Sequence, residues 1–160
     1  MDQHASLLER IDRYVERIFV GPDPALAQTL VDAKAAGLPD ISVSPNEAKL
    51  LYLLAKMCGA RRILEIGTLG GYSTTWLARA AGPGGEVISL ELMPHHADVA
   101  RRNIARAVNE PRVDIRVGPA ADSLRAMIAA REAPFDFIFI DADKPSYYEY
   151  LDLSVQLARP

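Results

Sequence analysis

The sequence predicts an α/β fold of the doubly wound type, in which helices cover both faces of a mostly parallel sheet. Short apolar runs rich in β-branched residues alternate with longer segments of helical periodicity over residues 60–160. Glycines follow the first apolar run at residues 67–71, where such folds turn sharply. Acidic residues stand at the ends of three runs, where parallel strands present their carboxyl ends to a ligand.

Three helices are expected before the sheet. Apolar residues recur at helical spacing over residues 7–19, with charged residues on the other side, which predicts an amphipathic first helix. A second helix over residues 25–36 ends at a glycine, and residues 38–43 form a loop. Ser44 and Glu47 then make a capping box around a proline, which is a strong signal for the start of a third helix.

Four strands and four helices are expected in the remainder. We divide the chain, as a single domain, into a helical cap over residues 1–59 and an α/β core over residues 60–160. The strands are expected near residues 63 and 87 and over residues 113–117 and 135–140, and the helices over residues 74–81, 95–107, 122–130 and 146–158. Right-handed crossovers would give the strand order 3-2-1-4 and leave the last strand as an open, apolar edge.

The segment over residues 62–73 is the expected ligand-binding element. Its glycines allow a sharp turn and close approach of a ligand to the backbone, and the following helix directs free N–H groups at the loop. A dinucleotide fingerprint would read Gly-x-Gly-x-x-Gly, whereas here Thr68 follows Gly67 and the pattern is Gly67-x-x-Gly70-Gly71. No lysine follows the glycines, as a P-loop would require. A ligand without a pyrophosphate fits this loop better, although a purely structural glycine turn is the alternative.

The second strand ends at Glu91. A carboxylate at this position can accept two hydrogen bonds from a ribose diol, whereas the simpler alternative is a solvated acid at a strand end. The loop and Glu91 together predict a nucleoside ligand.

Three motifs in this order resemble the metal-dependent O-methyltransferase family that includes catechol and caffeoyl-CoA O-methyltransferases. They are Glu-Ile-Gly-Thr-Leu-Gly-Gly-Tyr-Ser-Thr at residues 65–74, Glu91, and Asp-Ala-Asp-Lys-Pro at residues 141–145. The likeness extends from about residue 12 to the end. It implies transfer of a methyl group from S-adenosylmethionine (SAM) to a hydroxyl of a small phenolic or catechol-like substrate, assisted by a divalent cation such as Mg²⁺, in a homodimer.

The resemblance also implies the site residues. Those expected at the cofactor are Val43, Ser44, Glu65, Gly67, Thr68, Gly71, Tyr72, Ser73, Glu91, Ala120 and Asp141. Asp141 is expected to bind the cation and to serve catalysis, and Lys144 to take the proton from the substrate hydroxyl. A strand-end carboxylate and a solvated lysine are the simpler alternatives for these two residues. Tyr72 and Trp76 are expected to pack against the sheet.

Three other polar residues carry weaker predictions. Asp122 is expected to cap a helix, and His95 and His96 are expected on the surface at a helix start.

One feature departs from the family pattern. Related enzymes complete the metal site with an Asp-Asn pair at the tip of a further strand, and this sequence ends at Pro160 without it. We therefore expect a truncated chain with an incomplete metal site. The alternatives are a non-catalytic cofactor-binding fragment and a tRNA hydroxyuridine O-methyltransferase; a nicotinamide dehydrogenase is disfavoured by the missing glycine.

The composition limits the partners and the cellular compartment that fit these predictions. The 160 residues carry a net charge of −3, with lysines and arginines scattered among acids, so nucleic acid is an unexpected partner. The single cysteine, Cys58, cannot form an internal disulfide and is expected in the core, which favours a reducing compartment. The sequence shows neither a signal peptide nor a membrane-spanning apolar segment, so a cytoplasmic location is expected.

Overall fold

Four parallel strands form the sheet at the centre of the molecule. The structure is a computed structural model that describes residues 6–110 and 112–160. The strands are β1 (Arg62–Ile66), β2 (Glu86–Glu91), β3 (Arg112–Val117) and β4 (Phe137–Ile140), and they lie in the order β3-β2-β1-β4. The predicted fold class and the predicted order 3-2-1-4 are confirmed.

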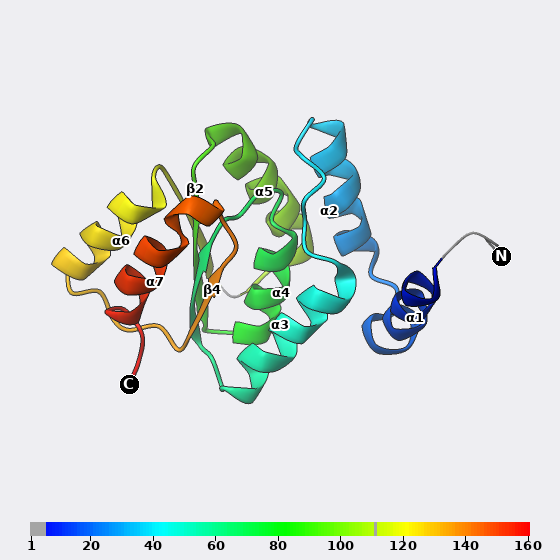
Figure 1. The fold of residues 1–160 in the computed structure, drawn as a ribbon, viewed down its shortest axis with the longest axis horizontal. Helices are drawn as coiled ribbons and strands as arrows, with labels where there is room; N and C mark the ends of the chain where they lie inside the picture. The colour runs from blue at the N-terminus through cyan, green and yellow to red at the C-terminus, as the bar shows by residue number, and fades with distance from the viewer. Residues whose placement is uncertain (1–5, 111) are drawn as a thin grey trace.

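Helices cover both faces of the sheet (Figure 1). On one face, α6 (Ala120–Ala129) and α7 (Tyr147–Val155) pack on the side chains of β1 and β2 that point toward them, such as Leu64 and Leu90. On the other face, α3 (Pro45–Met57) and α4 (Tyr72–Ala81) enclose Ile63 and Val87, and α5 (Pro94–Ala107) packs beside them over β3. Because strand side chains alternate, Glu65 shares the α4 face with Ile63.

The N-terminal helices lie at the end of the molecule away from α6 and α7 (Figure 1). They are α1 (Leu7–Val15), which continues as the π-helical turn η1 (Glu16–Val20), and α2 (Pro24–Ala35). The predicted first helix is therefore present but widens in its last turn. No residue of α1 is buried, although its sequence is amphipathic. Its exposed apolar residues, with those of η1, are Leu7, Leu8, Ile11, Tyr14, Ile18 and Phe19.

Two predictions about single residues were wrong. Asp122 does not cap α6, because the helix begins at Ala120 and Asp122 lies in its first turn, paired with Arg125. Cys58 is exposed, because α3 ends at Met57 and the cysteine stands at its C-terminal cap, outside the packed face.

The last elements are shorter than predicted. The helix expected over residues 146–158 starts as a 3₁₀ turn, η2 (Lys144–Ser146), and is regular only from Tyr147 to Val155. Phe135 lies outside β4 and bridges to Ala158 instead. The four residues of β4 form an edge of the sheet and are each partly exposed, as the strand order predicted.

None of the helices within the described ranges is long and apolar enough to cross a membrane.

Candidate functional site

A cavity of about 740 Å³ lies at the carboxyl ends of the strands. Its size falls in the range of small-molecule sites. Eight of the predicted site residues line it: Val43, Gly67, Thr68, Tyr72, Ser73, Glu91, Ala120 and Asp141. Four do not: Ser44, Glu65, Gly71 and Lys144.

The glycine loop between β1 and α4 forms the floor of this cavity. Gly67 has φ +101°, and a Cβ there would lie 1.9 Å from the carbonyl oxygen of Asp141, which directly follows β4. Gly71 has φ +84° and is the N-cap residue of α4, and a Cβ there would lie 3.1 Å from the side chain of Ile104. Both positions therefore require glycine for backbone conformation and for space. The loop also holds Leu69 at φ +49°, which is unusual for a residue with a side chain.

Glu91 holds the loop in this conformation. Its Oε2 accepts hydrogen bonds from the backbone N–H groups of Thr68 (3.2 Å) and Leu69 (2.8 Å). Its Oε1 accepts one from the N–H of Met93 (2.9 Å) and lies 3.4 Å from Nδ1 of His96. Glu91, whose carboxylate was predicted to bind a ribose, thus also fixes the backbone of the glycine loop.

Glu65 lies beneath the loop and is fully buried. The hydroxyls of Ser73, Thr74 and Ser89 donate to its carboxylate, at 2.6 Å for Ser73 and Ser89, and Thr68 shares a 2.6 Å hydrogen bond with Ser89. Burial raises the pKa of Glu65 to about 7, against the opposing effect of the hydroxyl hydrogen bonds. Glu65 therefore supports the loop from below and has no surface in the cavity.

Several residues that support the loop carried no prediction. Asn103 of α5 is buried and donates from Nδ2 to the carbonyl oxygen of Gly70 (2.9 Å). Ser89 joins Thr68 to Glu65 from the middle of β2. A polar residue within an otherwise apolar strand is the sequence signal that could have identified Ser89. Asn103 has no comparable signal, because it stands among charged residues of an amphipathic helix.

The predicted surface position was wrong for His96. It lies in the cavity wall against Glu91, with its side chain 21% exposed, whereas His95 is exposed as expected and contacts the carbonyl oxygen of Ala36.

The wall opposite Glu91 comes from β4 and the segment after it. Asp141 lines the cavity, where partial burial and the negative charge of Glu47 raise its pKa. Asp143 accepts from the hydroxyls of Ser146 (2.6 Å) and Tyr150 (2.8 Å), which lower its pKa. Lys144 is exposed on η2 and does not line the cavity, so its predicted role in proton transfer stays a prediction.

The loop before α3 closes the remaining side. Val43 lines the cavity, while Ser44 caps α3: its hydroxyl accepts from the N–H of Glu47, whose carboxylate accepts from the N–H of Ser44. The predicted capping box is confirmed. Tyr72 is buried and also contributes to the cavity, and Trp76 is buried and packs edge-on against Tyr52 of α3. Both rings cluster with residues of α2 and α3, so the prediction that they pack against the sheet was wrong.

The metal prediction rests on Asp141 alone. In the part of the chain that the structure describes, no three histidine, cysteine or acidic side chains are grouped so that they could hold a metal ion. The residues present therefore do not make a divalent-cation site by themselves.

The family model described as O-methyltransferase matches residues 22–160. The chain belongs to this O-methyltransferase family. The resemblance of the three motifs is thereby confirmed, and the cavity lies where they meet.

Characterised members of the family are closely similar. The chain is 50% identical to a catechol O-methyltransferase from Mycobacterium tuberculosis over 93% of this chain and 66% of the relative. It is 47% identical to another from Niastella koreensis over 96% and 70%. It thus spans about two thirds of the length of these relatives.

Solved structures agree in fold. An O-methyltransferase from Bacillus cereus in complex with S-adenosylhomocysteine (SAH) has a TM-score of 0.91 and 48% identity, covering 94% of this chain and 69% of that one. An O-methyltransferase from Streptomyces achromogenes in complex with SAM has a TM-score of 0.90 and 40% identity, covering 98% and 71%.

Proposed function

We propose that this chain binds SAM in the cavity and serves transfer of its methyl group to a hydroxyl of a small phenolic or catechol-like substrate. The observation that carries the proposal is the charge of the cavity. Its charged lining residues are Glu91, Asp141 and Asp143, and no lysine or arginine lines it within the described residues. SAM bears a sulfonium and an ammonium group, and both are favoured beside carboxylates. The relatives that bind SAM or SAH support the same ligand.

In this proposal each part of the ligand has a partner of suitable chemistry. The ribose hydroxyls donate to Glu91, whose carboxylate lies beside the glycine loop. The adenine lies against Pro119 and Ala120, where small residues allow a flat ring to approach the backbone. The methionine end lies near Gly67 and Val43.

The reaction requires alignment, a deprotonated hydroxyl and a dry site. When bound, the sulfonium supplies an electrophilic methyl carbon, which the substrate oxygen attacks as the carbon–sulfur bond breaks and SAH leaves. Gly67 lets the backbone approach the ligand, and apolar residues such as Val43 and Leu69 exclude water. Lys144 takes the hydroxyl proton in this proposal, reaching the site from the rim.

Mg²⁺ assistance at Asp141 is a separate hypothesis, and no step above depends on it. Partial burial and the negative charge of Glu47 raise the pKa of Asp141, and a bound cation would favour its ionised form. However, the described residues do not complete its coordination.

This incomplete coordination favours a second candidate function. The chain would then be a cofactor-binding unit that binds SAM without turning it over.

Binding is tested by calorimetric titration with SAH. We expect Glu91→Ala to weaken SAH binding by roughly 1.5–3 kcal/mol, the scale of a hydrogen bond to a charged group. Glu86→Ala is the matched control, because Glu86 is an acid at the opposite end of the same strand and pairs with Arg62. Absence of SAH binding by the unchanged chain would overturn the proposal.

Turnover is tested with SAM and catechol, with and without Mg²⁺. Lys144→Ala should lower the rate on the order of 10²–10⁴-fold while SAH affinity is kept. SAH binding without any methylated product would support the second candidate. Methylation of a hydroxyuridine-containing transcript in preference to catechol would instead identify a nucleic-acid substrate.

A further inference from the structure

The carboxylate of Glu91 already has four partners in the free protein. Oε2 accepts from the N–H groups of Thr68 and Leu69, and Oε1 faces the N–H of Met93 and Nδ1 of His96. An ionised carboxylate offers about four lone-pair sites; backbone amides occupy three of them, and His96 lies beside the fourth. A ribose hydroxyl can bind Glu91 only by sharing or replacing one of these partners.

His96 is the partner that can leave. The other three are backbone amides, fixed by the glycine loop and by the start of α5. His96 reaches Glu91 through a side chain with two rotatable bonds, at 3.4 Å, a longer separation than that of any amide. It also lines the cavity and is partly exposed, so the ring has open space beside it.

We propose that His96 occupies, in the free protein, the position on Oε1 of Glu91 that a ribose hydroxyl takes on binding, so that protonated His96 competes with the cofactor. This inference rests on the proposed SAM binding and adds to it a positioning residue that determines how binding depends on pH.

The surroundings of His96 isolate this pair. Beside it on α5 is His95, with ring centroids 6.3 Å apart. Across the cavity stand Asp141, Asp143 and Tyr150.

Most other charged groups near α5 are engaged elsewhere. On the helix, Asp98 pairs with Arg101 (2.9 Å), which also donates to the carbonyl oxygen of Ile115 on β3. Near its C-terminal end, Asp32 of α2 pairs with Arg106 (2.7 Å) and Arg79 of α4 donates to the carbonyl oxygen of Ala107. Glu91 is thus the one acid within 4 Å of His96 in the described residues.

Proton linkage gives the direction of the effect. Histidine is the side chain that ordinarily changes charge between about pH 5 and 8. The protonated imidazole is attracted to Glu91 and competes with the ribose hydroxyl, so binding favours the neutral ring and is linked to proton release. The SAH affinity should therefore fall as the pH falls, by up to about tenfold per pH unit.

The experiment is SAH calorimetry at about pH 6 and pH 8, each in two buffers of different ionisation enthalpy, which counts the protons released. We expect the unchanged chain to lose affinity at pH 6 and to release a proton on binding. In His96→Gln, the SAH affinities at the two pH values should differ by less than about twofold, and binding should release only a small fraction of a proton. His95→Gln is the matched control and should behave as the unchanged chain. All measurements are repeated in a Glu65→Gln background, because Glu65 titrates in the same pH range.

The outcomes separate the two proposals. A pH dependence unaltered by His96→Gln, with tight binding at pH 8, would overturn the role of His96 and leave SAM binding standing. Affinity that rises at low pH would also overturn it. No SAH binding at pH 8 would overturn the proposed function itself, and this inference with it.

Discussion

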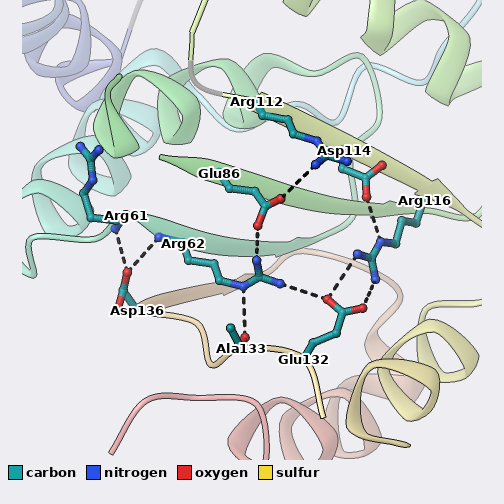
Figure 2. A network of polar contacts seen from close by, with 9 residues as sticks. All are labelled: Arg61, Arg62, Glu86, Arg112, Asp114, Arg116, Glu132, Ala133 and Asp136. Atoms are coloured by element: carbon teal, nitrogen blue, oxygen red, sulfur yellow. Dashed lines mark hydrogen bonds and ion pairs between the residues drawn. The ribbon is translucent and has the colours of Figure 1, made fainter. Parts of the chain in front are cut away.

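The two ends of the sheet use charge in opposite ways. At the amino ends, Arg62 pairs with Glu86 and with Glu132 (3.0 Å), and Glu132 also pairs with Arg116 (2.8 Å). Figure 2 shows that this network joins the first three strands to the segment that precedes β4. Arg61 donates from its guanidinium to the backbone carbonyl oxygens of Ala81 and Pro83, and the other charges of the network face opposite charges, so the network links elements of the fold.

At the carboxyl ends the carboxylates have neutral partners. Glu91 is held by backbone amides, Glu65 by hydroxyls and Asp143 by the hydroxyls of Ser146 and Tyr150. None of these three, nor Asp141, forms an ion pair with lysine or arginine in the described residues. Hydrogen bonds from neutral groups fix the position of a carboxylate without neutralising it. One end of the sheet is therefore built for stability, and the other keeps negative charge for a cationic ligand.

The largest effect is expected at the junction of the glycine loop. Gly67→Ala places a methyl group against the carbonyl oxygen of Asp141 at a positive φ, and should destabilise the fold by about 2–5 kcal/mol and abolish SAH binding. Denaturant unfolding and calorimetry measure both. Gly118→Ala at the end of β3 is the control, because its φ is also positive, +140°, but nothing lies within 4 Å. An equal loss in the two variants would mean that backbone conformation, and not contact with Asp141, is decisive.

A change at the amino ends should affect stability alone. The carboxylate of Asp136 accepts from the N–H groups of Arg61 and Arg62, both at 2.8 Å, and pairs with Arg159. Burial opposes its ionisation, but these partners hold the pKa of Asp136 below its ordinary value. Asp136→Ala should lower the free energy of unfolding by about 2–4 kcal/mol, because two backbone donors lose their acceptor. If SAH affinity in the folded variant also fell, the two ends would not be independent.

Glu65 should make stability depend on pH in an uncommon direction. Its pKa rises from 4.5 to about 7 in the folded chain, so between these values the native state binds more protons than the unfolded state. Stability from this group is then present at low pH and is lost as the pH rises through about 7, by on the order of 3 kcal/mol. Glu65→Gln resembles the protonated form and should flatten this part of the curve in denaturant melts. An unchanged slope would show that Glu65 is already ionised when folded.

The smallest effect is expected from one pair in the network of Figure 2. Glu132→Gln removes a charge shared by Arg62 and Arg116 on a partly exposed surface, and should cost about 0.5–1 kcal/mol. High salt should lower the free energy of unfolding of the unchanged chain toward that of the variant, because exposed ion pairs are screened. A loss that salt does not alter would indicate that packing rather than charge is responsible.

The fold was predictable because its signals are local. Alternating apolar runs and helical segments determine the strands, and the handedness of crossovers then gives the strand order. The errors occur where tertiary packing overrides a local pattern. Asp122 has the chemistry of a cap, but α6 starts two residues earlier at Ala120. The amphipathic pattern of residues 7–19 correctly predicts a helix, yet its apolar side finds no cover and α1 buries no residue.

The motifs of the site could be predicted from the sequence, but the residues that hold the glycine loop in place could not. Gly67, Glu91 and Asp141 stand at strand ends, a position that sequence reveals. Asn103 acts on Gly70, 33 residues away in the sequence, and His96 acts on Glu91 across the turn from β2 into α5, so both contacts depend on how α5 lies on the sheet. Glu65 belongs to the motif, but its neighbours enclose it completely and it does not line the cavity.

The position of β4 also has a consequence for how the chain acquires its structure during synthesis. β1 is central in the sheet, yet its second neighbour is β4, and Arg62 and Asp136, which bond at the start of these two strands, are 74 residues apart in sequence. While the ribosome makes the intervening segment, β1 has only β2 beside it, and its other edge is unpaired. Closing so long a loop is slow compared with forming the local helices. The floor of the cavity, where the glycine loop meets Asp141, is therefore completed among the last parts of the molecule, and the cavity has no complete wall until β4 has joined the sheet.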